Sequence, residues 1–194
     1  MLISKEKCKQ LSDLEIIRKA LEEVDFFSCL FDRYEGKLMR YIKNLAPVSH
    51  DEAEDILQDS FISIWKHLNE FDNQLNLSSW IYRIVHNQTI SALRKRKSFG
   101  KDRTVAIEEA TEVAADIERD TGGINKEDLI RKVLDQLPLM YKEVLVLKFL
   151  ENMRYEDISD ILKIPEGTVA TRINRAKKAF QMYSADLRLE TDDE

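Results

Sequence analysis

The stretch SHDEAEDILQDSFISIWKHL, residues 49–68, predicts a long amphipathic helix. Ser49 and Glu52 stand three positions apart, as in a capping box, and favour a helix start at this point. Behind them, apolar residues recur at steps of three and four, which places them on one face of a helix. These residues are Ala53, Ile56, Leu57, Phe61, Ile64, Trp65 and Leu68. We therefore expect a helix of about five turns with one buried face.

The composition extends this expectation to the whole chain. Only five glycines and three prolines occur among 194 residues, which disfavours turn-rich β architectures and favours long helices. In the first half we expect further helices over about residues 12–24, 26–45 and 78–97. Ser12 with Glu15 forms a second capping box, and Ser78 can cap the last of these helices.

The charge balance and the hydropathy pattern exclude several classes of protein. Thirty basic against 36 acidic side chains give a net charge of -6, which argues against a general coat for nucleic acid. The longest purely apolar run, Val144–Leu147, is far too short to span a bilayer. Residues 1–10 are charged and show no secretory signal, so we expect a cytoplasmic protein.

The cysteines and histidines indicate no metal site. Cys8 and Cys29 form no CxxC pair, and we interpret them as reduced cytosolic thiols without a structural role. His50, His67 and His86 have no ligand spacing with the cysteines. We expect no metal, no cofactor and no small-molecule substrate.

Residues 98–125 are typical of a flexible linker. The segment holds three of the five glycines, lacks a sustained helical period and reverses its charge along its length. Residues 94–103 carry six basic side chains against one acidic, whereas residues 108–120 carry six acidic against one basic. The expected fold class is all-α, with two small helical domains joined by this linker.

The second domain has the pattern of a helix-turn-helix. Four helices are expected here, over about residues 125–137, 138–152 and 155–162 and from 165 onward. Lys163 and Ile164 form the turn between the last two. Two short helices on a tight turn, the second of them basic, are typical of a DNA-binding helix-turn-helix.

Two helices carry candidate residues for nucleic-acid binding. The outward face of the last helix presents Thr168, Thr171, Arg172, Asn174, Arg175 and Lys178. Such cations can neutralise phosphates, and Thr and Asn can bond base edges, although a solvated surface helix has a similar pattern. The helix before the linker presents Trp80, Arg83, Asn87, Arg94, Lys95, Arg96 and Lys97. Aromatics with cations can hold a single strand, while a core role for Trp80 is an equal alternative.

The helix over residues 49–68 has an acidic outer row. Asp51, Asp55 and Asp59 stand four residues apart, with Glu54 and Gln58 beside them. Acidic residues near a helix N-terminus are favoured by the helix dipole, but Asp59 lies beyond the first two turns. Because like charges at this spacing repel, we expect the row to face a basic partner.

These segments resemble two regions of a known family. FDRY (31–34), AEDILQDSF (53–61), SWIYRIVHN (79–87) and RKRK (94–97) resemble region two of bacterial sigma factors. LP (137–138), YEDI (155–158) and IPEGTV (164–169), followed by Arg172 and Arg175, resemble region four. The order of the two regions and the linker between them are similar to the extracytoplasmic-function (ECF) sigma factors. The resemblance covers about residues 24–183.

The resemblance implies a role for each region. Residues 24–97 are expected to dock on the clamp helices of core RNA polymerase, with Glu54, Asp55, Gln58 and Asp59 as the docking face. The same region is expected to capture the melted −10 promoter strand, with Trp80 and Asn87 as its best-matched positions. Residues 126–183 are expected to read the −35 element in the major groove. Residues 1–23 are an N-terminal helical extension and 184–194 an acidic tail.

The same resemblance implies promoter melting without catalysis by this chain, and an anti-sigma factor as a further partner. Ala170 stands where the family often has a cation, so Thr171 and Asn174 become the better candidates for base contacts. A stand-alone helix-turn-helix regulator is one alternative. A second alternative is a metal phosphohydrolase, suggested by the dipeptide His50-Asp51. The sequence offers no further His and Asp residues to complete such a metal site.

Overall fold

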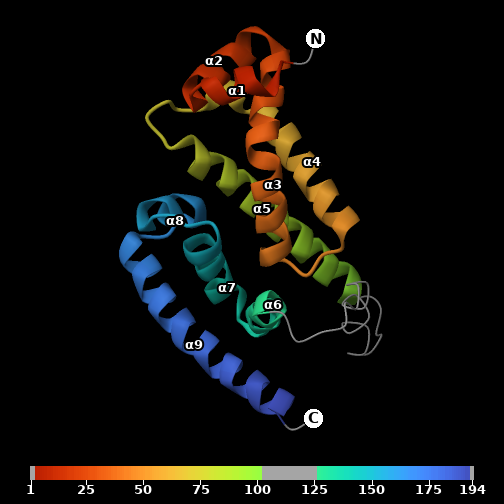
Figure 1. Cartoon of the computed structure of the whole chain (residues 1–194), viewed down its shortest axis with the longest axis vertical. Coiled ribbons are helices and arrows are strands. Elements are labelled where there is room, and N and C mark those ends of the chain that lie inside the picture. The colour runs from red at the N-terminus through yellow and green to blue at the C-terminus, as the bar shows by residue number, and fades with distance from the viewer. Residues whose placement is uncertain (1–2, 102–125, 193–194) are drawn as a thin grey trace.

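The computed structural model describes residues 3–101 and 126–192, and every regular element in these two ranges is helical, as predicted (Figure 1). The first half comprises α1 (Lys5–Gln10), α2 (Asp13–Glu22), η1 (Val24–Phe26), α3 (Phe27–Leu45), α4 (His50–Lys66), η2 (Leu68–Glu70) and α5 (Leu77–Lys101). The second half comprises α6 (Lys126–Gln136), α7 (Leu139–Leu145), the π-helical turn η3 (Val146–Leu150), α8 (Tyr155–Leu162) and α9 (Glu166–Asp192). Residues 102–125, most of the expected linker, lie outside the described residues.

The helices α3, α4 and α5 form the core of the first half. They pack against one another, and α1 and α2 lie across the N-terminal end of α3 (Figure 1). Their contact completely buries large side chains, among them Leu38, Tyr41, Ile64 and Ile81. The predicted apolar face of α4 is buried, except for Trp65 near its end, which is 39% exposed.

Polar caps determine where these helices begin. Glu15 and Glu52 accept hydrogen bonds from the backbone N–H groups of Ser12 and Ser49, at 2.7 and 2.8 Å, which confirms both capping boxes. The prediction that Ser78 caps α5 is wrong. Asn76 precedes the helix instead, and its Oδ1 accepts from the N–H of Ser79 at 3.3 Å.

Both long helices extend further than predicted. The α5 helix ends at Lys101 rather than near Lys97, so four residues assigned to the linker are helical. The α9 helix continues to Asp192, through most of the segment predicted as a separate acidic tail. No Pro occurs beyond Pro165 and no Gly beyond Gly167, so this segment contains neither of the residues that most disfavour a helix.

The helices α8 and α9 form the predicted helix-turn-helix. Lys163 follows α8 in the left-handed conformation, with φ of 54°, and so reverses the chain direction. The Ser159 hydroxyl donates to the Ile164 carbonyl at 2.6 Å across this turn. Val169 and Ile173 are buried on the inner face of α9, which packs against α6, α7 and α8 and leaves its opposite face exposed.

The interpretation of the cysteines as unpaired thiols is wrong for this structure. Cys8 in α1 and Cys29 in α3 form a disulfide across a sequence separation of 21 residues. Both residues are buried, and their Cα atoms lie 5.2 Å apart. The pair could not be predicted from the sequence, because the two cysteines form neither a CxxC motif nor part of a larger cysteine framework.

Candidate nucleic-acid interface

Four of the predicted −35 residues form one exposed stripe on α9. Counted from Thr171, the next members Asn174, Arg175 and Lys178 follow at three, four and seven positions, which places all four along one helix face. All four are exposed. The Thr171 hydroxyl donates to the carbonyl of Gly167 at 2.8 Å and keeps its lone pairs available. The stripe therefore combines two polar side chains with two cations on a helix held by a buried opposite face.

Arg172 and Thr168 lie further inward than the stripe. Both are partly buried, and Arg172 Nη1 contacts Glu143 Oε1 of α7 at 3.1 Å. Burial raises the pKa of the Glu143 carboxyl, and the Arg172 guanidinium opposes that rise. Arg172 is thus committed to an internal ion pair, and the structure does not group it with the exposed cations.

The predicted −10 residues divide along α5 between buried and exposed positions. Trp80 is 9% exposed, and its ring centroid lies 5.3 Å from that of Phe71 in an edge-on contact. Arg83 is half-buried, whereas Asn87 is exposed. Trp80 therefore lies in the core, which was the alternative to a nucleic-acid contact, whereas Asn87 lies at the surface.

The basic end of α5 meets the start of α4. Arg94, Lys95 and Arg96 are exposed, while the Lys97 side chain lies outside the described residues. Arg96 Nη1 donates to the carbonyl of Pro47 at 2.8 Å and lies 3.7 Å from Glu52 Oε2. One of the predicted DNA cations therefore also ties α5 to the loop before α4.

The predicted docking residues Glu54, Asp55, Gln58 and Asp59 are all exposed on the outer side of α4. Asp55 and Asp59 border a shallow groove of about 230 Å³ between α4 and the end of α5. Arg96 lines the same groove. The acidic row thus faces solvent beside a basic segment, and its carboxylates are accessible to a cationic partner.

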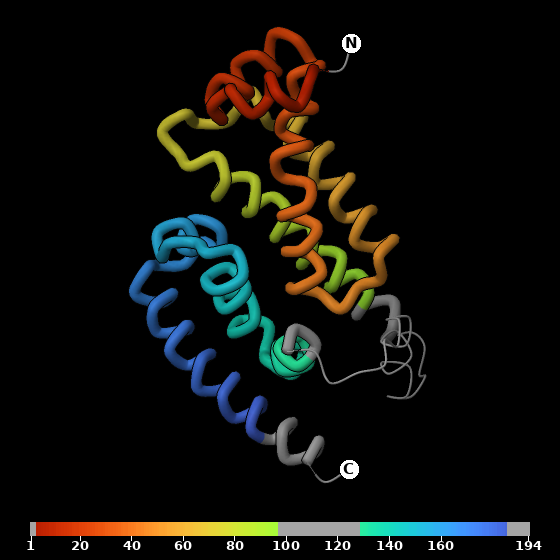
Figure 2. The backbone as a smooth tube through the Cα atoms, in the orientation of Figure 1, coloured from red at the N-terminus to blue at the C-terminus, as the bar shows by residue number. Residues whose placement is uncertain are grey.

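A polar contact joins α5 to the helix-turn-helix, and sequence reasoning missed it. Asp157 of α8 accepts hydrogen bonds from the Ser79 hydroxyl at 2.8 Å and from Asn76 Nδ2 at 3.3 Å. Burial alone raises the pKa of Asp157, but hydrogen bonds from Arg154 and Ser79 outweigh that effect and lower it. In Figure 2 the N-terminal part of α5, coloured yellow-green, lies next to α8, coloured blue.

Two further contacts extend this junction. The Tyr82 hydroxyl donates to Glu151 at 2.6 Å, and His86 Nε2 lies 3.8 Å from Glu143. Burial lowers the pKa of His86 to about 4, so the ring is neutral near pH 7, and its Nδ1 is hydrogen-bonded to the Tyr41 hydroxyl at 2.8 Å. No local motif announces these pairs, because their members lie far apart in the sequence.

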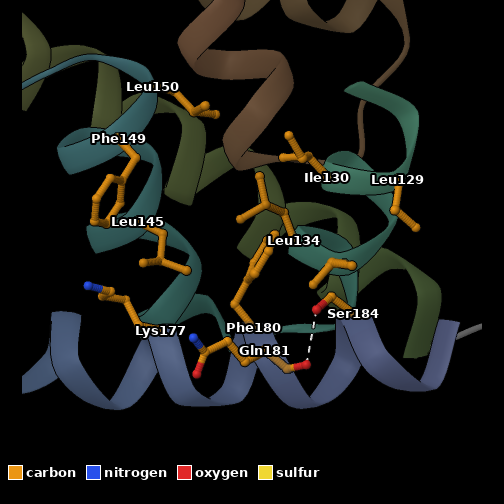
Figure 3. Close-up of a pocket in the computed structure, with 11 residues that line it drawn as sticks. Leu129, Ile130, Leu134, Leu145, Phe149, Leu150, Lys177, Phe180, Gln181 and Ser184 are labelled. Atoms are coloured by element: carbon orange, nitrogen blue, oxygen red, sulfur yellow. Dashed lines mark hydrogen bonds between the residues drawn. The ribbon is translucent and has the colours of Figure 1, made fainter. Parts of the chain in front are cut away.

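An apolar hollow of about 410 Å³ lies between α6, the α7–η3 segment and α9 (Figure 3). Leu134, Leu145, Phe149 and Phe180 line it, and Lys177 lies at its edge. This lining suits apolar contacts rather than acid–base chemistry. Within the described ranges, no cluster of His, Cys, Asp and Glu is arranged to hold a metal ion, and no helix is long and apolar enough to cross a membrane.

Comparisons with known proteins identify the family. The model of sigma-70 region 2 matches residues 30–99, and that of sigma-70 region 4 matches residues 127–180. The chain is 34% identical to the ECF RNA polymerase sigma factor SigW of Bacillus subtilis, covering 89% of this chain and 98% of that protein. It is 26% identical to the ECF RNA polymerase sigma-E factor of Haemophilus influenzae, covering 89% and 95%.

Solved structures agree with this assignment. The sigma factor RpoE of Bartonella quintana, in complex with the anti-sigma factor NepR, aligns with a TM-score of 0.64 and 26% identity over 81% of this chain and 95% of that chain. CnrH, in complex with the cytosolic domain of CnrY, shares the fold with a TM-score of 0.64 over 86% of this chain and 93% of that chain. The chain therefore belongs to the ECF RNA polymerase sigma factors.

Proposed function

We propose that this chain binds core RNA polymerase, directs it to promoters with −35 and −10 elements, and assists promoter melting. The observation that carries the proposal is the order of the two sigma regions in one chain, residues 30–99 and 127–180. The chain acts in the cytoplasm and catalyses no reaction itself. Its functional units are region two (24–97), a linker (98–125) and region four (126–183), between an extension (1–23) and an acidic tail (184–194).

The acidic row of α4 is the docking face for polymerase. Glu54, Asp55, Gln58 and Asp59 are exposed together on a helix whose other face is buried in the core. A rigid helix holds their spacing, so the row can meet a basic surface without a large ordering cost. Opposite charges across such a contact also speed association and select the partner.

The −10 element binds along α5 as a single strand. Asn87 is exposed and can hydrogen-bond a base edge, while Arg94 and Lys95 are positioned for the sugar–phosphate backbone. Trp80 supports this surface through Phe71, and reaches a base only after the 71–80 segment moves. A base captured outside the stack fits the proposed role in melting, because its unpairing is part of the binding.

The −35 element binds α9 as a duplex. Asn174 and Thr171, exposed on the outer face of the helix, contact base edges, and Arg175 and Lys178 on the same face contact phosphates. Arg172 contributes through its ion pair with Glu143, which fixes α9 on α7.

Binding both elements at once requires the two halves to separate. By their names the −35 and −10 elements are centred about 25 positions apart, which is about 85 Å of B-form DNA at about 3.4 Å per base pair. The α5 helix, with 25 residues, is only about 37 Å long and is bonded to α8 through Asp157. The contacts of Asp157 with Ser79 and Asn76 therefore belong to a closed state of the free chain.

An anti-sigma factor is the further partner that this closed state fits. The RpoE structure, 26% identical to this chain, is a complex with an anti-sigma factor. A partner that binds the closed form more tightly than the open form increases the population of the closed form. The larger this difference in affinity, the smaller the fraction of chains that remains open for polymerase. Its action on this chain is thus the stabilisation of contacts that the chain already makes.

Run-off transcription with core RNA polymerase and a promoter library tests the proposed function. We expect transcripts only when the chain is present, with a shared sequence at the −35 and −10 positions of the selected promoters. A stable dimer that binds a specific duplex with nanomolar affinity, and gives no transcript with polymerase, would contradict it.

A further inference from the structure

The Cys8–Cys29 disulfide ties the N-terminal extension to the core of region two. It joins α1 to α3 and encloses α2 and η1 between its two ends. Both cysteines are buried, at 5% and 1% exposure, so the bond lies inside the contact between the two helices. The separation of their Cα atoms, 5.2 Å, is within the usual range for a disulfide.

Without this bond, α1 has few anchors. Cys8 is the only buried residue of this six-residue helix. The remaining attachments of α1 itself are polar: Arg33 Nη2 donates to the carbonyls of Cys8 and Leu11 at 2.7 and 2.8 Å, and Lys5 Nζ lies 3.8 Å from Asp32 Oδ1. Lys7 Nζ lies 5.1 Å from the centre of the Phe26 ring, and the flanking residues Ile3 and Leu11 pack only partly buried against the core. A helix this short is not stable by itself, so we expect these partly exposed contacts to hold it less firmly once the covalent bond is broken.

The extension reaches the proposed −10 surface through α2. Leu14, Ile17 and Leu21 of α2 line a hollow together with Leu68 and Phe71. Phe71 in turn contacts the ring of Trp80 on α5. A continuous path of packed side chains therefore leads from the helices that the disulfide secures to the segment that precedes α5.

We propose that Cys8 and Cys29 are a reversible redox pair that controls how firmly α1 and α2 are docked on region two. This inference rests on the proposed function in one respect, the cytoplasmic location. In a reducing compartment a protein disulfide is usually transient and redox-sensing rather than permanent. The structure describes the oxidised form, in which α1 is clamped.

The chemistry is an exchange with a low-molecular-weight disulfide. The thiolate of Cys8 attacks one sulfur of the reagent, and the other sulfur leaves as a thiolate that takes up a proton. The thiolate of Cys29 then attacks the mixed disulfide on Cys8 and releases the second thiol. Two protein thiols are oxidised, and one disulfide molecule is reduced to two thiols.

The surroundings of Cys8 suit this reaction. Lys5 lies on the same helix and is paired with Asp32 of α3 at 3.8 Å in the clamped form. Lifting α1 from α3 separates this pair, and a cation near the sulfur then favours the thiolate form that attacks. Exposure requires only α1 to lift from α3, which is a local opening of a terminal element and not global unfolding. Cys29 lies within the longer α3 helix and stays in place while α1 moves.

Equilibration of the full chain in mixtures of reduced and oxidised glutathione, followed by alkylation and mass measurement, tests whether the pair is reversible. We expect a single transition between a form with two alkylated cysteines and a form with none, recovered in both directions. Amide hydrogen exchange on the same samples measures docking. We expect exchange over residues 5–22 to be about tenfold slower in the oxidised protein.

The variants Cys8→Ser and Cys29→Ser are matched controls, since each keeps one thiol and cannot form the bond. Both are expected to exchange at the rate of the reduced wild type in every mixture. Thiols that remain alkylatable in the oxidising mixtures, or equal exchange over residues 5–22 in the two wild-type forms, would overturn the proposal. Neither readout uses polymerase or DNA, so a failure here is distinct from a failure of the sigma-factor function.

Discussion

The helices α5 and α9 are both proposed to contact promoter DNA, but they differ in how far their polar residues are already engaged. On α9, Asn174 and Arg175 belong to a stripe that faces solvent. On α5, Ser79 and Tyr82 are hydrogen-bonded to the second half, and Trp80 is buried against Phe71. The proposed −35 surface is therefore exposed in the closed chain, whereas the proposed −10 surface becomes complete only after α5 leaves α8 and Trp80 separates from Phe71.

This difference indicates an order of events. The duplex can meet α9 without any rearrangement of the free chain. In the proposed mechanism, the whole surface of α5 becomes available to the single strand only when polymerase holds the two halves apart, so we expect melting to depend on the holoenzyme. The net charge of -6 on the whole chain agrees with weak DNA binding by the free protein, since it averages the basic stripe with the acidic surfaces.

Removal of the docking charge is expected to have the largest effect, because it separates both helices from polymerase. In Asp55→Lys with Asp59→Lys, two exposed carboxylates become cations facing the basic partner surface. We expect binding to core polymerase to weaken by more than about 100-fold with unchanged helicity, measured by fluorescence anisotropy and circular dichroism. The double variant Glu22→Lys with Glu35→Lys changes the net charge equally at other exposed positions and is expected to bind normally.

Asn87→Ala tests whether α5 captures the single strand through this exposed side chain. Loss of one base contact is expected to reduce open-complex formation by about 10- to 100-fold, with polymerase affinity unchanged. Permanganate footprinting of the melted strand measures the first quantity, and anisotropy the second. An equal loss in both would mean that Asn87 supports docking rather than strand capture.

The junction between the halves has its own pH dependence, set by His86. The pKa of this buried ring is about 4 in the folded chain, against 6.5 for an unperturbed histidine. The unfolded chain therefore binds more protons between these two values, so stability from His86 is complete above pH 6.5 and is lost as the pH falls toward 4. Acidification from pH 7 to 5 is expected to cost at most about 2 kcal/mol.

The pKa of Glu143 is raised in the folded chain, so protonation of this carboxyl stabilises the fold as the pH falls. Glu143 therefore reduces the loss of stability that His86 causes on acidification. Chemical denaturation at pH 5, 6 and 7 measures the effect, and His86→Gln is expected to show a smaller slope between pH 5 and 7. His67→Gln is the matched control, because that histidine is exposed. Identical pH slopes for the wild type and His86→Gln would contradict the assignment.

The smallest effects are expected on α9, where base and phosphate contacts can be told apart. Arg175→Ala is expected to weaken duplex binding by the holoenzyme several-fold on all promoters, and to lower the salt slope by about one. Asn174→Ala is expected to change the preferred −35 sequence with little change in salt dependence. A selection from a randomised −35 library measures the preference, and an unchanged profile would argue against a base contact by Asn174.

The outer faces of the helices were predictable from sequence, and their inner connections were not. The row on α4 and the stripe on α9 follow from helical spacing alone, because exposed polar residues on a stable helix keep their predicted direction. The capping boxes at Ser12 and Ser49 were equally predictable, since both partners lie within one turn. The helix start before α5 was not, because Asn76 and Ser78 are both good caps.

The contacts that join distant segments had no sequence signal. Asp157 and Ser79 are separated by 78 positions, and Cys8 and Cys29 by 21, without a motif that links either pair. Arg172 has the spacing of a DNA-contacting residue, and only the packing of α9 on α7 brings it to Glu143. Tertiary packing decides which polar side chains of a recognition helix stay free.

The distance between Gln74 and Asp160 tests the opening of the chain most directly. Both side chains are exposed, one before α5 and one on α8, on either side of the Asp157 contact. Spin labels can be attached to the cysteines of Gln74→Cys and Asp160→Cys, in a chain with Cys8 and Cys29 replaced by Ser. The distance between the two labels is then measured by pulsed electron paramagnetic resonance. We predict one short distance in the free chain and a much longer one in the complex with core polymerase and promoter. A short distance retained in a complex that transcribes would contradict the account.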